Sequence, residues 1–589
     1  MKARSEIAQE FKWDLTKFCA NEQDFYQRLK KVETEIEGFA QYEGKLSDDE
    51  MLFECLEKEM SLVKEFSLLA MYAELSFTED GASRSAQEMT EKENLVAAKF
   101  TTVTSFIDVE ISKFEDEKLK ALQNNAKFAN YKRYFEGVLR EKKHTLDKAE
   151  ELLLSKLSEC FGNESTNFDM FSDTGLKFDD IEDSNGNKHP LNQANYLTYR
   201  QSEDRLLRKN ACKEMLSKYG QFVNFLSNNY IANVKQDCVF AKLRKYESAL
   251  DRALFDEEVS RKVYDLLVEK VAQNVDIVAS YHKTKQKLLG LEDFFGYDSL
   301  APVAKIETKY TYQEAIDLIK KAVSVLGEDY VALIDKAQQE RWIDVYANKN
   351  KQSGAFSAST YGATPVVLTN FEGDLDGVFA LAHELGHAMH SYYSYQNQPI
   401  QTCEYVIFVA EVASIVNEML LLKYLLENAK TREEKLYYTD YFLREMKAAV
   451  FVQTMLSEFE RFAHEQYESE EPLSADLLCE KYQELEEQYF AGSIKPIEEN
   501  KYAWLLYSHF YSSFYVYKYA TGFLSAVLIA DKLLTNEKFV EKYKQFLSSG
   551  CSKDPISLLK IAECDLEDEK TFDNAFAVCR KHLKMFEEA

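Results

Sequence analysis

Apolar residues recur at helical spacing through most of this chain, and residues that interrupt helices are scarce. One run steps by four, four, three and three positions through Leu52, Leu56, Met60, Val63 and Phe66. Such spacing places side chains on one face of an α-helix. The 589 residues include only 19 Gly and 7 Pro, both of which are unfavourable inside helices. The sequence therefore predicts long amphipathic helices.

Turn-forming residues break this pattern in a few places. Gly and Asn recur between 161 and 195, which predicts a soft domain boundary there. Residues 353–364 are rich in turn formers, and Pro365–Thr369 is expected to be a short strand. Helices are predicted again over 311–340 and from 374 to 589.

The formal net charge of −28 opposes binding to phosphate backbones, so nucleic acid is not an expected partner. The negative charge indicates a well-solvated surface or, alternatively, a negative electrostatic potential in a substrate cleft. The ten cysteines include no CxxC pair, which favours reduced thiols. No signal-like or membrane-spanning apolar stretch occurs. We therefore expect a cytoplasmic protein with no membrane partner, and no obligate protein partner is evident.

The motif HExxH is formed by His383, Glu384 and His387. Chance would give roughly 0.02 copies in a chain of this composition. Histidines at i and i+4 lie on one face of a helix and can share one tetrahedral ion. Asp374 or Asp376 can cap such a helix. The alternative is two core histidines beside a surface glutamate.

Glu384 is placed to act on water rather than to bind the metal. It is adjacent to His383 and three residues before His387. A zinc ion lowers the pKa of a water that it binds to about 7. Glu384 can then take the proton and pass it to the leaving amine.

A catalytic zinc needs a third protein ligand and an open position. The extended pattern HExxHxxGxxH fails because position 390 is His. Glu411 is the one acid in an apolar run 24 positions after His387, and a buried lone carboxylate favours a cation partner. It could instead face outward at a helix edge. Glu404 and Glu418 are rivals, and Glu418, one heptad on, is expected to support a ligand.

His390 lies at i+3 from His387 and i+7 from His383, near the same face of the predicted helix. It could be a ligand, a hydrogen-bond donor beside the ligands, or a satisfied core histidine. The last two are favoured because His383, His387 and Glu411 already complete a site.

A third cluster, Trp504–Gly522, is rich in aromatic residues. Tyr511, Tyr515 and Tyr519 are spaced four apart and form a stripe at helical spacing. The stripe could be core packing. Alternatively, its phenols and the His509 imidazole could stabilise the oxyanion that forms when water attacks a peptide carbonyl.

At this point the sequence resembles the thimet-oligopeptidase-like metallopeptidases, and most closely the bacterial oligoendopeptidase F branch. The resemblance runs through almost the whole chain. Its segments are Trp13–Leu15, His144–Leu146, Glu150–Leu153, Arg205–Arg208, Tyr246–Leu250, Ala382–His390, Phe408–Ser414 and His509–Gly522. The last three are the most specific.

The resemblance implies a mainly α, two-lobed helical body with a deep central channel. A short β-sheet is expected beside the zinc-binding helix. The channel would admit short unstructured peptides and exclude folded proteins. The implied division is an N-terminal helical region at 1–110, an oligopeptidase-type helical domain at 111–190 and a catalytic domain at 191–589.

The resemblance also implies roles for individual residues. His383, His387 and Glu411 would bind one Zn²⁺ per chain, and Glu384 would be the general base. His509 with Tyr515 and Tyr519 would be catalytic donors, and Tyr517 and Tyr361 would contact substrate. Their spacing, rather than the resemblance, is the reason to expect His390 and Glu418 to support the metal ligands. The strand at 365–369 resembles an edge that pairs with the substrate backbone.

The resulting function hypothesis is a zinc endopeptidase acting on short peptides. A metallocarboxypeptidase on a similar scaffold is the nearest alternative, and it would need a cation for the substrate's terminal carboxylate. A non-catalytic peptide-binding protein with a structural zinc is an alternative of another class, but structural sites usually have four protein ligands. Cobalt or manganese could occupy the same ligands.

Overall fold

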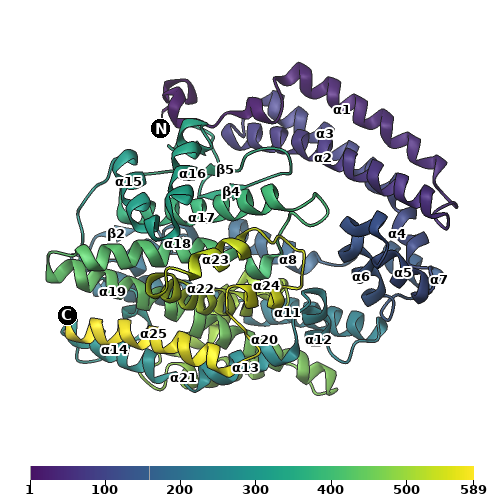
Figure 1. Ribbon diagram of the computed structural model, residues 1–589. Coiled ribbons are helices and arrows are strands. Elements are labelled where there is room, and N and C mark those ends of the chain that lie inside the picture. Colours follow the sequence, from purple (N-terminus) through teal and green to yellow (C-terminus); the bar gives the residue numbers. More distant parts are fainter. Residues whose placement is uncertain (1, 158–159) are drawn as a thin grey trace. The chain divides into compact units, whose positions relative to one another are not determined.

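The computed structural model describes residues 2–157 and 160–589. Within these ranges helices dominate, and the strands form one two-stranded and one three-stranded sheet (Figure 1). The prediction of a mainly helical protein is therefore confirmed. No helix in the described ranges combines the length and apolar character needed to span a membrane.

The chain divides into two compact units. The first comprises Met1–Lys143, Glu307–Tyr424 and Ile529–Glu563, and the second comprises His144–Ile306, Leu425–Leu528 and Cys564–Ala589. Helices α18 (Ile407–Asn428) and α22 (Tyr517–Thr535) contribute residues to both units. The domain boundaries expected near 110 and 190 stay a prediction.

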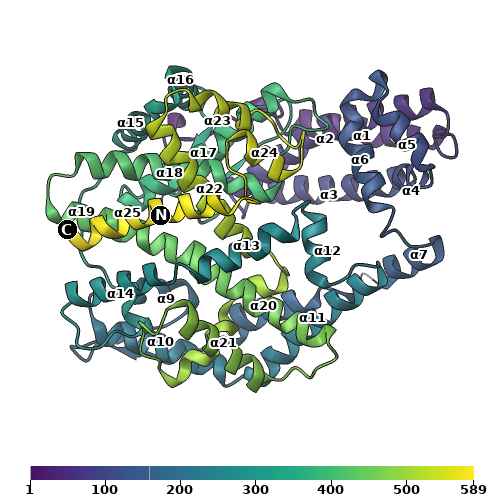
Figure 2. The same ribbon diagram turned by 60° about the horizontal axis from the view of Figure 1, so that its bottom comes forward.

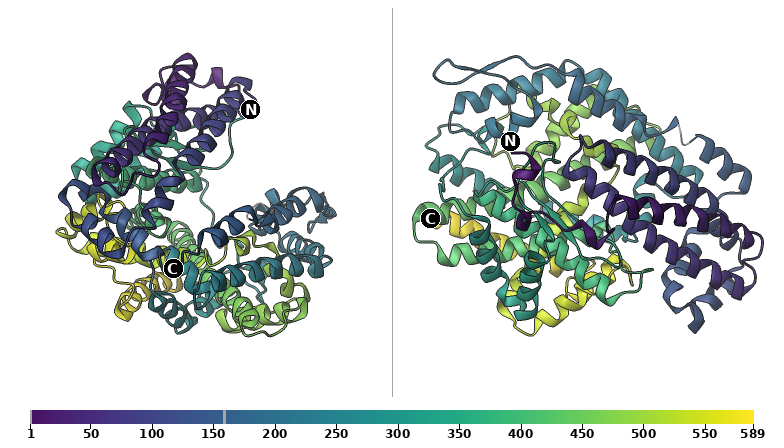
Figure 3. Two further views of the ribbon diagram at one scale, coloured as in Figure 1. Left: turned by 90° about the vertical axis from the view of Figure 1, so that its right-hand side faces the viewer. Right: turned by 90° about the horizontal axis from the view of Figure 1, so that it is seen from above.

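The first unit begins with a helical layer, purple in Figure 3, in which α1, α2 and α3 pack against one another. Side chains of Asn21 and Asp48 cap α1 and α2 by accepting hydrogen bonds from backbone amides. Their apolar faces, including Phe25 and Leu52, form one core cluster. The helices of this unit are α1 (Glu22–Ile36), α2 (Asp49–Glu79), α3 (Arg84–Thr104), α4 (Phe106–Ile111), α5 (Asp116–Gln123), α6 (Lys132–Glu141), α15 (Tyr312–Ala322), α16 (Glu328–Gln339), α17 (Leu375–Asn397), α23 (Phe539–Leu547) and α24 (Pro555–Ile561).

In the described residues of the second unit, the strands are confined to the short hairpin of β1 (Ile181–Glu182) and β2 (Lys188–His189). Figure 2 shows α11, α20 and α21 packed side by side. A π-helical segment, Lys447–Val452, joins α19 to α20. The helices are α7 (Lys148–Leu157), α8 (Asn163–Met170), α9 (Gln193–Arg200), α10 (Arg205–Gly220), α11 (Val223–Leu243), α12 (Ala249–Asp256), α13 (Arg261–Ala272), α14 (Asp276–Leu288), α19 (Arg432–Met446), α20 (Gln453–Glu468), α21 (Ala475–Tyr489) and α25 (Glu569–Glu588).

A small sheet lies against α17 in the first unit, as expected. Its strands are β3 (Ile343–Asp344), β4 (Phe356–Ala358) and β5 (Val366–Leu368), in the order β3-β5-β4. The predicted strand at 365–369 is β5, but its expected place at the sheet edge is wrong. β5 is parallel to β3 and antiparallel to β4, so both of its hydrogen-bonding sides are occupied. The edge strands are β3, which is buried, and β4, which is partly exposed. β4 lies in the segment predicted as turns.

The continuous helical region expected from 374 onward is interrupted before α22. Residues Glu498–Leu506 and Ser508–Tyr511 form 3₁₀ helices, and Phe514 has a φ of +57°. Tyr511, Tyr515 and Tyr519 therefore do not share one α-helix. Their fourfold spacing alone could not reveal this break, because aromatic side chains also recur in irregular packed segments.

Candidate active site

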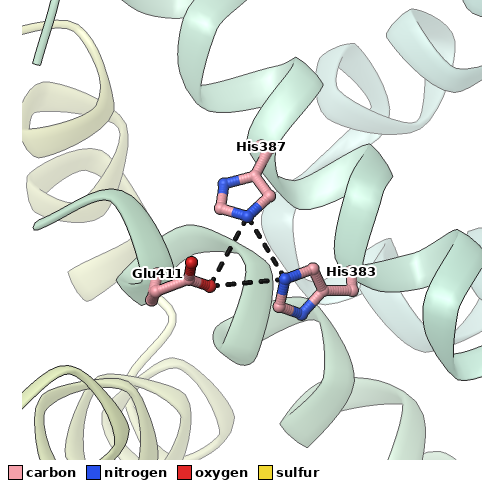
Figure 4. Close-up of side chains that lie close together, drawn as sticks. All are labelled: His383, His387 and Glu411. Atoms are coloured by element: carbon pink, nitrogen blue, oxygen red, sulfur yellow. Dashed lines mark hydrogen bonds and ion pairs between the residues drawn. The ribbon is translucent and has the colours of Figure 1, made fainter. Parts of the chain in front are cut away.

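Helix α17 presents the two motif histidines on one face. Its first turn is capped by Asp374, whose side chain accepts a hydrogen bond of 2.9 Å from the Gly377 amide. One turn of helix separates His383 from His387, and their ring centroids lie 4.9 Å apart. The two Nε2 atoms approach to 3.2 Å (Figure 4). Both nitrogens are therefore directed at one small region.

Glu411 of α18 completes a triangle of donor atoms with the two histidines. Its Oε2 lies 3.3 Å from His383 Nε2 and 3.5 Å from His387 Nε2 (Figure 4). Among the described residues, these three form the one cluster of His, Cys, Asp and Glu side chains with the spacing of a metal site. We call His383, His387 and Glu411 the metal triad.

Close packing of α17 on α18 depends on Gly386, which lies between the two histidines. A Cβ atom added there would lie 2.5 Å from Ser414 Cα and 2.7 Å from Ala413 O. Contacts this short would force the helices apart. Sequence reasoning missed this role, although a glycine inside a helical pattern is a known sign of close backbone approach.

Asn417 is a second positioning residue that sequence reasoning missed. Its Nδ2 donates to Ala382 O on α17 at 3.2 Å, and its Oδ1 accepts from Tyr330 OH on α16 at 3.0 Å. The side chain is fully buried. A buried amide with both ends bonded fixes the three helices relative to one another. The only available signal was a polar residue within an apolar run.

Two hydrogen bonds orient side chains of the triad. Glu418 Oε1 lies 2.5 Å from His383 Nδ1, so Nδ1 would keep its proton and Nε2 would be the nitrogen that gives up a proton to a metal. Ser414 Oγ donates to Glu411 Oε2 at 3.1 Å. A carboxylate that holds the outer nitrogen of a histidine is typical of metal sites.

The electrostatics of the triad favour a cation. Burial lowers the pKa of His383, but hydrogen bonds to Glu411 and Glu418 outweigh it and raise the pKa to about 10. Burial likewise opposes ionisation of Glu411, yet its contacts with both histidines hold the pKa of Glu411 well below the usual value. The Glu411 carboxylate therefore stays ionised and attracts positive charge.

Glu384 also belongs to α17 and is 8% exposed. Burial raises the pKa of its carboxyl above the usual value, although His383 and His387 act in the opposite direction. Glu384 is not a member of the metal triad. A carboxyl whose pKa is shifted towards neutrality is suited to proton transfer.

His390 and Tyr361 lie apart from the donor triangle. The His390 ring is buried and stacks on Tyr405, with ring centroids 3.7 Å apart. Burial lowers the pKa of His390 to about 3, so the ring is neutral. Tyr361 packs edge-on against Tyr395 and lies under the Lys64 ammonium. In the described part of the chain, neither ring makes a hydrogen bond or ring contact with the triad, although the charge of His387 also lowers the pKa of His390.

We call residues 509–519 the tyrosine loop. His509 Nε2 lies 3.2 Å from Tyr519 OH, and the Tyr515 and Tyr519 ring centroids are 5.4 Å apart. Burial lowers the pKa of His509. Tyr517 differs from these residues: it is 1% exposed and its ring packs on Tyr264. Its predicted contact with substrate stays a prediction that this placement does not favour.

Comparison with known proteins identifies the family. Residues 198–578 match the family model for peptidase family M3, and residues 110–178 match that for oligopeptidase F. Oligopeptidase PepF of Bacillus subtilis is 33% identical, over 99% of this chain and 87% of its own. An oligoendopeptidase F homolog of Borreliella burgdorferi is 33% identical, over 99% of this chain and 98% of its own.

Solved structures show the same relationship. A Chlamydophila abortus crystal structure has a TM-score of 0.94 and 30% identity, covering 100% of this chain and 99% of its own. Oligoendopeptidase-F from Enterococcus faecium has a TM-score of 0.74 and 26% identity, covering 96% and 98%. With a family match over most of its length and full-length relatives of this kind, the chain belongs to peptidase family M3 and is a metalloendopeptidase of the oligoendopeptidase F type.

Proposed function

We propose that this chain is a zinc-dependent endopeptidase that hydrolyses internal bonds of short, unstructured peptides. The metal triad would bind the ion, and Glu384 would be the general base. One observation carries the proposal: three donor atoms from two helices meet at separations of 3.2, 3.3 and 3.5 Å. Side chains that only stabilised the fold would not need to direct three donor atoms at one point.

The donor set fits zinc. Bonds of 2.0 to 2.2 Å in a tetrahedral site place ligand atoms roughly 3.3 to 3.6 Å apart, which is close to the edges of the triangle. Two imidazole nitrogens and one carboxylate are also the ligand types of catalytic zinc sites, where a fourth position stays open. Cobalt or manganese could use the same ligands, so the identity of the ion is part of the proposal.

When bound, zinc would polarise the scissile carbonyl and acidify the attacking water. The chain's own residues supply the proton transfers and the orientation. Glu384, with its raised pKa, would take a proton from water and return it to the leaving amine. Glu418 keeps the His383 Nδ1 proton in place, so that His383 Nε2 remains a ligand.

The tyrosine loop would supply donors to the oxyanion of the transition state. The phenol of Tyr519 and the imidazole of His509 share a hydrogen bond, and Tyr515 packs against both. A neutral imidazole and two phenols are hydrogen-bond donors without a competing charge. Their use in catalysis is supported by this grouping and by the resemblance of the segment to its family.

The substrate backbone would pair with β4 rather than with β5. The inner side of β4 pairs with Val366–Leu368, and its other side is the edge of the sheet. An extended peptide added there would be held by main-chain hydrogen bonds, which do not depend on sequence. Restriction to short peptides is supported by the relatives' names, which are oligopeptidases. A channel that excludes folded proteins stays a prediction.

The test is hydrolysis of an internally quenched nonapeptide with blocked ends. Wild type should cut it, chelation should abolish cutting, and zinc should restore it. Glu384→Gln should lower kcat by about 10²- to 10⁴-fold, and the variant protein should still bind one zinc ion. Glu480→Gln, the same change at an exposed site on α21, is the matched control. Survival of the blocked peptide, with loss of C-terminal residues from an unblocked one, would favour a carboxypeptidase.

A further inference from the structure

The tyrosine loop is held by polar side chains of α11 and α20, which the mechanism above does not use. Asn233, Glu460 and His464 are buried, and Asp237 is partly exposed. All of these residues belong to the second compact unit. Helices α11 and α20 pack directly on each other (Figure 2). The contacts fall into two groups, one around Glu460 and one around Asp237.

Glu460 of α20 binds the backbone of the loop. Its side chain is fully buried, and Oε1 accepts a hydrogen bond of 2.7 Å from the Phe514 amide. The other oxygen, Oε2, has no hydrogen-bond partner among the described residues. An ionised carboxylate buried in this way would be costly. Burial raises the pKa of Glu460 well above its usual value, which is consistent with a neutral carboxyl.

Asp237 of α11 holds the preceding residue of the loop. Its Oδ2 accepts a hydrogen bond of 2.5 Å from Ser513 Oγ and one of 3.2 Å from Asn233 Nδ2. Asn233 Nδ2 also lies 3.1 Å from Ser513 Oγ and 3.4 Å from Phe510 O. His464 Nε2 is 3.5 Å from the same Asp237 oxygen. Two helices thus fix three positions in the middle of the loop.

The backbone between these contacts has an unusual conformation. Phe514 has a φ of +57°, the left-handed region that a bulky side chain rarely adopts. Its ring is 2% exposed and lies 4.7 Å from the His464 ring. Such a conformation persists only where surrounding contacts impose it, and it is found preferentially at functional sites. The very next residue is Tyr515.

We propose that Glu460 and Asp237 are positioning residues that set the orientation of Tyr515, Tyr519 and His509 for the reaction. The proposal rests on the proposed role of these three side chains as transition-state donors. Glu460 fixes the Phe514 amide, and Asp237 fixes Ser513. The resulting left-handed turn connects the 3₁₀ helix Ser508–Tyr511 to α22. It leaves the rings of His509, Tyr515 and Tyr519 in contact with one another.

The alternative is that these buried contacts only stabilise the fold. A purely structural role would change stability without a specific effect on kcat. A positioning role predicts a fall in kcat with little change in KM, because donors that act only in the transition state do not contribute to ground-state binding. The two roles can therefore be distinguished by the change in kcat relative to the change in KM.

The main variants are Glu460→Leu, which removes the acceptor, and Glu460→Gln, which keeps an oxygen and a similar volume. Glu458→Leu is the matched control: Glu458 lies on the same helix and accepts a 2.7 Å hydrogen bond from Tyr489, away from the loop. Each is measured for kcat and KM on the quenched nonapeptide. Hydrogen exchange of the peptide spanning 508–519 provides a readout that does not depend on activity.

We expect Glu460→Leu to lower kcat by about 10- to 100-fold, the scale of a small misplacement of catalytic groups. KM should stay within about twofold, and exchange in 508–519 should accelerate. Glu460→Gln should recover most of the loss, and Glu458→Leu should leave kcat and loop exchange near wild type. An unchanged kcat and unchanged loop exchange in Glu460→Leu would overturn the proposal, as would an equal loss in Glu458→Leu.

Two further variants keep the outcome decisive. If Glu460→Leu does not fold, Ser513→Ala removes the hydroxyl that contacts both Asp237 and Asn233 and leaves the Glu460 contact in place. This variant should give a smaller fall in kcat with faster loop exchange. No change in either quantity would contradict the proposal. Tyr519→Phe separates this test from the proposed function. If Tyr519→Phe keeps full kcat, the donor role fails, while faster loop exchange in Glu460→Leu would still show that Glu460 holds the loop.

Discussion

The metal triad and the tyrosine loop each place three side chains with a proposed catalytic role, but they do so with different kinds of backbone. The triad projects from two α-helices, α17 and α18, which meet closely at Gly386. The loop side chains project from a 3₁₀ helix, a turn and the first turn of α22. The position of the triad therefore depends on regular helix geometry. The conformation of the loop depends instead on hydrogen bonds with polar side chains of α11 and α20.

This difference bears on how much each site depends on single contacts. Helical hydrogen bonds repeat along α17, so the two histidines keep their spacing without outside help. The loop has no such repeat, and its shape depends on Glu460 and Asp237. We therefore expect the triad to be sensitive to the spacing between helices, and the loop to be sensitive to individual polar contacts.

Among the changes that test this comparison, the largest effect is expected from removing a donor in the loop. Tyr519→Phe should lower kcat by about 10²- to 10³-fold with KM nearly unchanged, as for the loss of one oxyanion donor. Steady-state kinetics on the quenched nonapeptide measures it. Tyr502→Phe, in a 3₁₀ helix of the same unit, controls for loss of a phenol elsewhere. If Tyr519→Phe kept a normal kcat, the Tyr519 phenol would not be a catalytic donor.

The next effect tests helix spacing at the triad. Gly386→Ala should destabilise the protein by about 1 to 3 kcal/mol and weaken metal binding, because the new Cβ would meet the backbone of α18. Gly137→Ala in α6 is the control, since no atom lies within 4 Å of its added Cβ. That change should be neutral or stabilising by up to about 1 kcal/mol. Thermal unfolding and zinc titration of both variants decide whether the spacing matters.

A smaller effect is expected from the carboxylate behind His383. Glu418→Gln should lower metal affinity by about 10- to 100-fold, because the amide cannot support the histidine with a negative charge. Competition with a chromophoric chelator gives the affinity. Glu404→Gln makes the same change of charge on an exposed side chain. If both variants lost the same metal affinity, the effect of Glu418 would be explained by long-range electrostatics and not by its contact with His383.

The smallest effect concerns pH and the buried Glu460. Its folded-state pKa is raised, first by burial and then by Asp237. The stability that it contributes is thus complete below the unfolded pKa near 4.5 and is lost as pH rises towards the folded value. The stability of wild type relative to Glu460→Gln should therefore fall as pH rises above the unfolded value near 4.5. Tyr230 and Tyr264 also face this carboxyl, so unfolding is compared below their titration. A difference independent of pH would mean that Glu460 is ionised when folded.

Much of the fold and the centre of the site could be predicted without the structure. Helical periodicity indicated a mainly α protein, and the i, i+4 spacing of His383 and His387 predicted that they share a face. Glu411 was singled out because an isolated acid in an apolar run needs a partner, and it lies beside both histidines. These inferences succeed because they use local periodicity, which the backbone of a helix preserves.

The sequence by itself determined the helices, the motif and the family pattern, since each of these is written within one helical segment or within the chain as a whole. Only the tertiary structure decided that β5 is central, that Gly386 brings two helices together, and that Glu460 reaches the Phe514 amide. Glu460 and Phe514 are 54 residues apart, and nothing local marks their contact. Pairing across such distances depends on how whole helices pack, so no periodic pattern in the sequence encodes it.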